Sequence, residues 1–147
     1  MILTAHPKIN IGLDILRRRA DGYHDLDTLM VPIEAVSDTL EIEPSLGGGC
    51  SLTTEGLGID CASDRNLVVK AWMLLREMYG VGGVKIKLHK QIPFGAGLGG
   101  GSADGAAVLV ALNEIFNTSY PEKVLCRIGV KVGADIITVH AEACVHL

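Results

Sequence analysis

The sequence predicts one domain that mixes α-helices and β-strands, an α+β fold. Several short segments alternate between apolar and polar residues, and three longer segments place apolar residues at helical spacing. With 147 residues, 48% of them hydrophobic and 20% charged, the chain can bury a core of its own. No repeat or low-complexity linker divides the sequence, so we expect a single domain over residues 1–147.

Alternating apolar residues predict the strands. Residues 8–16 read KINIGLDIL and are expected to form a half-buried strand, which charged residues and an Asp-Gly pair end in a loop at 17–25. Residues 84–90 read VKIKLHK, and their alternation directs Val84, Ile86 and Leu88 inward. Further strands are expected at 26–36, at 38–43 with Leu40 and Ile42 on one face, and at 51–54.

Three helices follow from spacing and from the residues at their ends. Ser63 or Asp64 is a candidate N-cap for a helix over residues 66–79, which the glycines at 80–83 terminate. The alanine- and leucine-rich residues 102–116 predict a second helix. Pro121 suits the start of a third, which ends near Gly133.

Composition argues against several functional classes. The net charge of −4 and the aromatic content of 4% give no reason to expect a nucleic acid or membrane partner. The sequence lacks a signal peptide and a long apolar span, so we expect a cytoplasmic protein. The four cysteines lack metal-ligand spacing and are expected to be free thiols, and Cys144 with His146 is only weak evidence for a metal site.

A glycine-rich stretch, IPFGAGLGGGSADG at 92–105, joins a predicted strand to a predicted helix. The unpaired N–H groups at a helix N-terminus attract anions, and glycines let a phosphate approach the backbone. Ser102 could add a hydroxyl donor or a magnesium contact. Asp104, expected in the first turn, suits the positive end of the helix dipole. The alternative interpretation is a flexible loop before a helix.

Three phosphate-binding motifs compete for this stretch. Walker A requires a lysine after its last glycine, but Ser102 follows Gly101. Gly95, Gly97 and Gly100 match the spacing of the dinucleotide fingerprint, but Glu114 lies within the next helix instead of ending a second strand. The third pattern comprises Pro93, Gly97, Leu98, Gly99, Ser102 and Ala103. It resembles the phosphate loop of the GHMP kinase superfamily of ATP-dependent small-molecule kinases.

Other segments strengthen this resemblance over roughly residues 5–136. They are PKIN at 7–10, RRADGYHDLDTL at 18–29 and DRNLVVKA at 64–71, and they resemble the superfamily members that phosphorylate a cytidine-diphosphate-linked sugar alcohol in non-mevalonate isoprenoid synthesis. The resemblance implies that 1–147 is the N-terminal ATP-binding domain, a mostly antiparallel sheet with helices on one face. It implies ATP and Mg²⁺ as cofactors and a small-molecule substrate. From the resemblance we expect residues 1–147 to lack the C-terminal domain that is typical of the family.

The resemblance also assigns roles to individual residues. Asp135 would orient or deprotonate the attacking hydroxyl and Lys8 would be its partner, whereas Asn10, Tyr23 and His24 would bind the substrate. The ATP-binding residues would be Asn66 together with Pro93, Phe94, Gly95, Ala96, Gly97, Leu98, Gly99, Gly100, Gly101, Ser102 and Ala103. No metal ligand is assigned beyond the possible Ser102 contact.

Taken singly, these residues have simpler interpretations. Lys8 would be a solvated strand lysine, Asp135 a residue just past a helix, Asn66 a helix cap, and the Tyr23-His24 pair a surface feature. Lys90 would either pair with phosphate or be solvated, and it is left unassigned.

The sequence departs from the family at two places. Pro7 replaces an alanine before the Lys-Ile-Asn motif, and Ile136 and Ile137 replace the Pro-Phe that follows Gly-Ala-Asp. Three functions therefore remain open: the sugar-alcohol kinase, a non-catalytic nucleotide-binding remnant, and a different small-molecule kinase of the superfamily. The oligomeric state is not specified.

Overall fold

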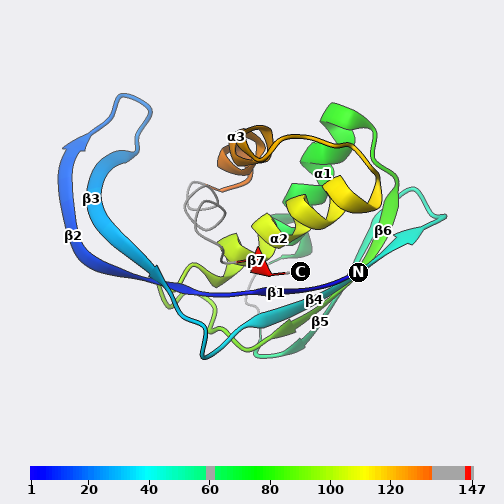
Figure 1. Cartoon of the computed structure of the whole chain (residues 1–147), viewed down its shortest axis with the longest axis horizontal. Coiled ribbons are helices and arrows are strands. Elements are labelled where there is room, and N and C mark those ends of the chain that lie inside the picture. Colours follow the sequence, from blue (N-terminus) through cyan, green and yellow to red (C-terminus); the bar gives the residue numbers. More distant parts are fainter. Residues whose placement is uncertain (59–61, 134–144, 147) are drawn as a thin grey trace.

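One face of a twisted sheet carries the three helices of the described part of the chain, and a long hairpin projects to one side (Figure 1). This computed structural model describes residues 1–58, 62–133 and 145–146. The sheet has the strand order β5-β6-β4-β1-β7, and β2 and β3 form a separate two-stranded hairpin. The strands are β1 (Ile2–Ala5), β2 (Lys8–Arg18), β3 (His24–Pro32), β4 (Asp38–Ser45), β5 (Cys50–Gly56), β6 (Gly83–Lys90) and β7 (Val145–His146).

The pairing in this sheet is mostly antiparallel, as expected. Strand β4 pairs antiparallel with β1 and with β6, and β1 pairs antiparallel with β7. The exception is the parallel pair β5–β6. A parallel pair needs a long crossover connection, which a short 3₁₀ helix (Ser63–Arg65) and α1 (Leu67–Tyr79) supply.

The three predicted helices are confirmed to within about two residues, the usual uncertainty of helix ends. Helix α1 begins at Asn66, whose Oδ1 accepts a hydrogen bond of 2.9 Å from the N–H of Val68, and ends at Gly80 in the left-handed region. Helix α2 (Gly100–Ile115) starts two residues earlier than predicted, and α3 (Glu122–Val132) follows.

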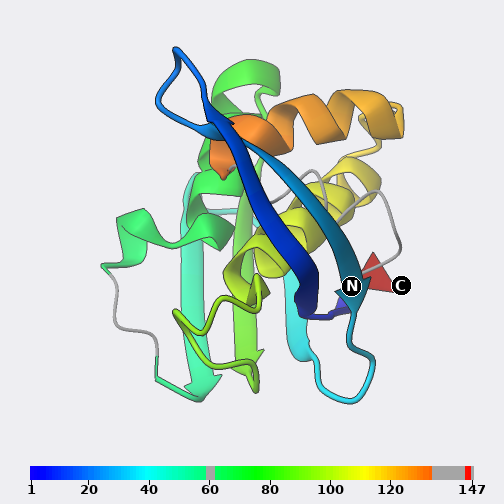
Figure 2. The same ribbon diagram turned by 90° about the vertical axis from the view of Figure 1, so that its left-hand side faces the viewer.

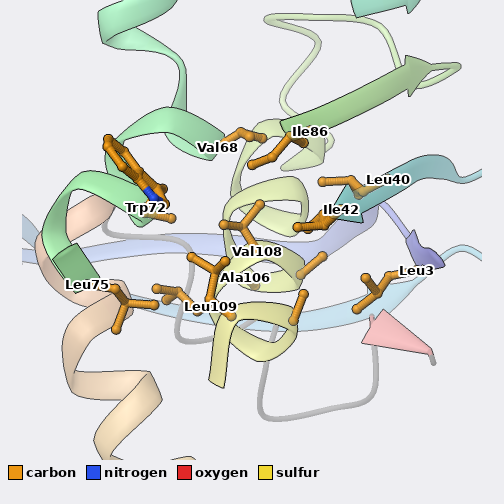
Figure 3. Close-up of a cluster of buried hydrophobic side chains, with 14 of the residues drawn as sticks. Leu3, Leu40, Ile42, Val68, Trp72, Leu75, Ile86, Ala106, Val108 and Leu109 are labelled. Atoms are coloured by element: carbon orange, nitrogen blue, oxygen red, sulfur yellow. The ribbon is translucent and has the colours of Figure 1, made fainter. Parts of the chain in front are cut away.

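Helix α2 lies at the centre of the core. It packs against the sheet and against both other helices, so nearly every side chain of its first three turns is buried. Figure 3 shows Ala106, Val108 and Leu109 of α2 between the strand residues Leu40 and Ile86 and the helix α1. Small alanines allow this close approach, and each large apolar side chain buried here contributes roughly 1.5–3 kcal/mol.

The β2–β3 hairpin departs from the prediction. Its alternating residues do form a strand, but the prediction of a half-buried strand was wrong, because every residue of β2 after Lys8 is exposed, including Ile15 at 65%. Figure 2 shows the hairpin crossing in front of the helices with its tip projecting beyond them. The predicted loop at 17–25 shrinks to residues 19–23, because Arg18 pairs with His24.

Two short strands were not predicted. Strand β1 lies between β4 and β7, and Pro7 follows it where the chain leaves the main sheet for the hairpin. Proline lacks an N–H, so its position between the two sheets costs no hydrogen bond of a strand ladder.

No helix in the described part of the chain is long and apolar enough to cross a membrane. Cys50 and Cys126 are free, as expected, whereas Cys61 and Cys144 lie outside the described residues.

Candidate functional site at the glycine loop

The glycine loop, residues 91–101, runs from the end of β6 into the first turn of α2. Gly95, Gly97 and Gly99 have φ values of +74°, +75° and +70°. A Cβ atom on Gly95 or Gly97 would meet nothing within 4 Å, so conformation and not crowding explains these two glycines. At Gly100 the reason is different, because a Cβ there would lie 2.7 Å from Ile92.

The first turn of α2 has backbone N–H groups without partners in the helix, and it follows the exposed part of the loop. Residues 93–97 are exposed, and Gly99 is the N-cap of α2 without a side-chain capping bond. The first intrahelical bond of α2 runs from the N–H of Ala103 to Gly99 O at 2.9 Å. The N–H groups that precede it have no acceptor within the helix, and the dipole adds positive potential at the same end. This arrangement suits a phosphate or another anion.

Lys8 is held against this loop. Its backbone N–H donates to Leu98 O at 2.8 Å, and its ammonium Nζ donates to Gly97 O at 3.1 Å. Its methylene groups cover Gly99, where a Cβ would lie 3.0 Å from Lys8 Cε. Lys8 is 6% exposed, so the alternative of a solvated strand lysine is wrong. Asn10 is exposed and lies two residues further along β2, on the same face as Lys8.

A buried charged cluster underlies both ends of the loop. It consists of Asp38 on β4, Lys90 on β6 and Asp104 on α2, and all three side chains are at most 3% exposed. Lys90 Nζ donates to Asp38 Oδ2 and, at 2.8 Å, to Asp104 Oδ2. Asp38 Oδ1 accepts from the N–H groups of Gln91 and Ile92 at 2.6 and 2.9 Å, so the cluster holds the start of the loop as well as α2.

The predicted position of Asp104 was wrong, and neither interpretation of the unassigned Lys90 holds. Lys90 is neither solvated nor free for phosphate, and Asp104 lies beyond the first turn of α2, facing inward. The overlooked signal was strand parity, since a continuation of the buried series Val84, Ile86, Leu88 reaches residue 90. The same parity, extended back from Ile42 and Leu40, reaches Asp38.

Burial and charge shift the protonation of the cluster. Burial raises the pKa of the Asp104 carboxyl to about 7, the Lys90 ammonium opposes this rise, and the Asp38 carboxylate adds to it. For Lys90, burial alone would lower the pKa, but the carboxylates of Asp104 and Asp38 more than offset that effect and raise it. Lys90 therefore stays charged at neutral pH, whereas Asp104 titrates there.

The remaining predicted residues fall into three groups. Asn66 caps α1, which confirms its simpler interpretation, and it lies near the loop because a Cβ on Gly101 would be 3.8 Å from Leu67. Ser102 is buried near the start of α2. Asp135 lies outside the described residues. No cluster of three or more His, Cys, Asp or Glu side chains in the described ranges could hold a metal ion.

Tyr23 and His24 lie at the opposite end of the hairpin from Lys8 (Figures 1 and 2). The strand between them rises roughly 30 Å along its length. Tyr23 is 60% exposed, and an Asp21 carboxylate that accepts from its N–H at 3.1 Å supports the turn. The hairpin therefore does not bring the Tyr23-His24 pair to the glycine loop.

The comparison that decides the family covers the loop itself. The family described as GHMP kinases N terminal domain matches residues 66–143, more than half of the chain. This chain belongs to the GHMP kinase family. The matched segment contains Asn66, the glycine loop, α2 and α3, so the family pattern coincides with the site described above.

Several curated relatives in this family are named 4-diphosphocytidyl-2-C-methyl-D-erythritol kinase. The protein from Pelotomaculum thermopropionicum is 46% identical over 139 residues, covering 92% of this chain and 48% of the relative. The protein from Chlorobaculum parvum is 48% identical over 135 residues, covering 91% and 46%. This GHMP kinase family chain thus spans about half the length of the curated relatives it matches.

Solved structures agree on the fold. A crystal structure of 4-(cytidine 5'-diphospho)-2C-methyl-D-erythritol kinase superposes with a TM-score of 0.75 at 38% identity, covering 95% of this chain and 48% of that one. A homoserine kinase from Cytophaga hutchinsonii superposes with a TM-score of 0.68 at 19% identity, covering 93% and 41%. The second likeness supports the GHMP fold alone. The predicted fold class, an α+β GHMP kinase N-terminal domain, is confirmed.

Proposed function

We propose that this chain is the N-terminal, ATP-binding domain of a cytoplasmic kinase that phosphorylates the 2-hydroxyl of 4-diphosphocytidyl-2-C-methyl-D-erythritol. The names of the curated relatives and of the 38% identical structure support this substrate. Since those relatives are about twice as long, residues 1–147 would be one of two domains that enclose the reacting groups.

The observation that carries the proposal is the glycine loop with Lys8 held against it. Three left-handed glycines turn the loop into the open N-terminus of α2, and no side chain caps that end. ATP phosphates would accept hydrogen bonds from these backbone N–H groups. The adenine would lie near Asn66, whose neighbour Leu67 is in contact range of the loop at Gly101.

Magnesium, when bound with ATP, would neutralise charge on the phosphates during transfer. The Ser102 hydroxyl is the one described group that we assign to it, and this fits the usual way in which Mg²⁺ binds, mainly through phosphates and water with few protein ligands.

The phosphoryl transfer would use Asp135 and Lys8. Asp135 would take the proton of the 2-hydroxyl as that oxygen bonds to the γ-phosphorus and the bond to the leaving ADP oxygen breaks. The Lys8 ammonium would stabilise the negative charge on the reacting groups during this step, and it already lies 3.1 Å from Gly97 O. Asn10, on the same strand face, would orient the hydroxyl, whereas Tyr23 and His24 would contact the cytosine from the hairpin tip.

Calorimetric titration of the chain with a non-hydrolysable ATP analogue and with the cytidylyl substrate tests the proposal, together with a coupled assay for ADP release. We expect both ligands to bind, and we expect Lys8→Met and Asp135→Asn to reduce any turnover at least a hundredfold. The matched controls Lys87→Met, on the exposed side of β6, and Asp14→Asn, on the hairpin, should leave it unchanged.

Other outcomes identify the alternatives. Nucleotide binding without turnover, and without an effect of Asp135→Asn, would show a non-catalytic remnant. Binding of mevalonate or homoserine in place of the cytidylyl compound would show a different GHMP kinase.

A further inference from the structure

We infer that this chain binds a second copy of itself, by packing one face of the β2–β3 hairpin on helix α3 of the other copy. The hairpin carries half of the large apolar side chains that are exposed in the described structure. A two-stranded hairpin is marginally stable in water unless another element packs against it, and contiguous exposed apolar residues are typical of interaction sites. The inference goes beyond the proposed function, since it requires neither a nucleotide nor the cytidylyl compound.

A bulge divides the apolar residues of the hairpin between its two faces. Residues directly opposite each other in an antiparallel pair lie on the same face. The pairing register shifts between Ile11 and Leu13, at Gly12. Because one extra residue reverses the alternation, Ile11 shares a face with Leu29, whereas Leu13 shares the opposite face with Thr28. The apolar residues of β2 therefore contribute to two separate surfaces.

The outer face of the hairpin is the one turned away from the glycine loop. Lys8, which contacts the loop, lies on the other face, and the helices lie behind the hairpin in Figure 2. The outer face consists of four directly opposite pairs, which are, from the base of the hairpin to its tip, Ile9–Val31, Ile11–Leu29, Asp14–Asp27 and Arg17–Asp25. It is therefore apolar at the base and charged toward the tip, and Ile11 and Leu29 are 53% and 61% exposed.

Two carboxylates on the outer face lack a cation. Asp14 and Asp27 lie directly opposite each other, and neither forms an ion pair with another described residue. Like charges directly opposite each other in a sheet are destabilising. A partner that supplies positive charge beside apolar groups would relieve this repulsion and would cover the neighbouring apolar pairs at the same time.

Helix α3 carries a surface of this kind. Its exposed residues Lys123, Arg127 and Lys131 recur every four positions, so they form one basic stripe along the helix. Val130, which is 46% exposed, borders this stripe. Within the described part of the chain, none of the three cations forms an ion pair. The other side of α3 packs against α1 and α2, so the stripe is available to a partner.

Other exposed cations are less suitable because they lie beside carboxylates. Lys87 pairs with Glu55 at 3.3 Å. Lys85 lies directly opposite Glu43 in the sheet. The α3 of the same chain lies behind the hairpin in Figure 2, on the side of the opposite face, so a second copy has to supply the stripe. If each hairpin packs on the other copy's α3, the two contacts are equivalent and the assembly closes as a two-fold dimer.

Sedimentation equilibrium of the full chain, at neutral pH and low salt, tests the inference. We expect the weight-average mass to rise from that of a monomer toward that of a dimer between micromolar and near-millimolar concentrations. Added salt should weaken the association, since it screens exposed charges. A chain that remains monomeric over the whole concentration range overturns the inference.

Two charge reversals identify the surfaces in contact. Asp14→Lys with Asp27→Lys makes the outer face of the hairpin basic, and Lys123→Glu with Arg127→Glu makes the stripe acidic. Each double variant alone should raise the dissociation constant at least about tenfold, because like charges would then meet. An equimolar mixture of the two should associate about as tightly as wild type, because both of its contacts again join opposite charges.

Matched controls make the same charge changes outside both surfaces. Glu77→Lys with Glu114→Lys, and Arg65→Glu with Lys70→Glu, alter exposed residues and should leave the dissociation constant unchanged. Association that the reversal on α3 does not weaken would show that the hairpin binds another surface, such as a second hairpin, and overturns the inference. A mixture of the two reversed variants that stays monomeric also overturns it.

A pair of apolar substitutions identifies the face of the hairpin. Ile11→Thr and Leu13→Thr both remove an exposed apolar side chain from β2, and threonine suits a strand. Ile11→Thr should raise the dissociation constant about fivefold, because its side chain is buried in the contact. Leu13→Thr, on the opposite face, should leave it unchanged. Equal effects of the two substitutions overturn the assignment of the outer face as the contact.

Discussion

Strands β6 and β2 have the same sequence pattern and opposite surroundings. In β6, alternate residues from Val84 to Lys90 are buried beneath the helices. In β2, Ile9, Ile11, Leu13 and Ile15 alternate just as regularly, yet all of them are exposed. Alternation thus predicts a strand in both cases, but burial depends on whether another layer covers the strand. The helices α1 and α2 cover the main sheet, and nothing in the described residues covers the hairpin.

The difference extends to charged pairs. Lys90 is 3% exposed between two buried carboxylates, whereas Arg17, 78% exposed, pairs with Asp25 on the hairpin. A buried ion pair is costly to break because the remaining charge stays desolvated, whereas an exposed pair contributes little. Matched substitutions in the two regions can therefore test how far their energetics differ.

The largest difference in stability between the two regions is expected for the cations of the two pairs, Lys90 and Arg17. Lys90→Met leaves the Asp38 and Asp104 carboxylates buried without their cation, and it should lower the free energy of unfolding by about 3–5 kcal/mol. Arg17→Met should lower it by less than about 1 kcal/mol. Urea unfolding of both variants measures this, and similar losses in the two would contradict the contrast.

The next largest effect is a change of folding stability with pH. Burial raises the pKa of Asp104 from 3.8 to about 7, so between these values the folded state holds a proton that the unfolded state has lost. This group's contribution to stability is therefore complete below about pH 4 and is lost as the pH rises through 7. Asp104→Asn should remove the loss, so its stability relative to wild type should rise by at most about 4 kcal/mol between pH 4 and pH 8.

Thermal unfolding across this range measures the slope, with Asp27→Asn in the exposed hairpin as the control. Parallel curves for wild type and Asp104→Asn would show that Asp104 does not titrate in this window.

For apolar residues, Leu88→Ala on β6 and Leu13→Ala on β2 form the matched pair. Leu88 is fully buried, so its truncation leaves a cavity and should reduce the unfolding free energy by about 3 kcal/mol. Leu13 is 52% exposed, and its truncation should change it by less than about 0.5 kcal/mol. A large loss at Leu13, measured by urea unfolding at increasing protein concentration, would reveal a partner covering the hairpin.

The smallest difference in stability between the two regions is expected at the glycines. Gly97 in the loop and Gly12 in the hairpin both have positive φ, and neither would place a Cβ within 4 Å of another group. Alanine at either position should cost about 1–2 kcal/mol from backbone strain. Only Gly97→Ala should also weaken the binding of an ATP analogue, which calorimetry measures. Equal binding in both variants would argue against the loop as the nucleotide site.

Much of the fold was predictable because its signals are local. The spacing of Leu67, Ala71 and Leu75 specified α1, and the alternation of Val84, Ile86 and Leu88 specified β6. Strand β1 was missed because four residues carry too little periodicity, and its pairing partners Asp38–Glu41 lie far along the chain. The exposure of the hairpin could not be predicted, since it depends on whether another element of the fold packs against it.

The candidate site divides in the same way. The glycine loop is recognisable from consecutive residues of the sequence, so its position before α2 was predicted correctly. The Asp38–Lys90–Asp104 cluster was not, because its members come from three elements and each alone resembles an ordinary surface charge. The functional roles of Lys8, Asn66, Asn10, Tyr23, His24 and Asp135 remain predictions.

The hairpin also bears on how the chain folds. Strands β1 and β4 pair although about thirty residues separate them, and closing a loop of that length has an entropic cost that grows with its logarithm. About two thirds of those residues belong to β2 and β3, whose own pairing brings Pro7 and Ile33 together through a hydrogen bond of 2.8 Å. A hairpin that forms first, within microseconds, shortens the remaining open segment about fourfold and lowers the closure cost by roughly 1 kcal/mol. The most exposed part of the molecule would then speed the assembly of its most buried sheet.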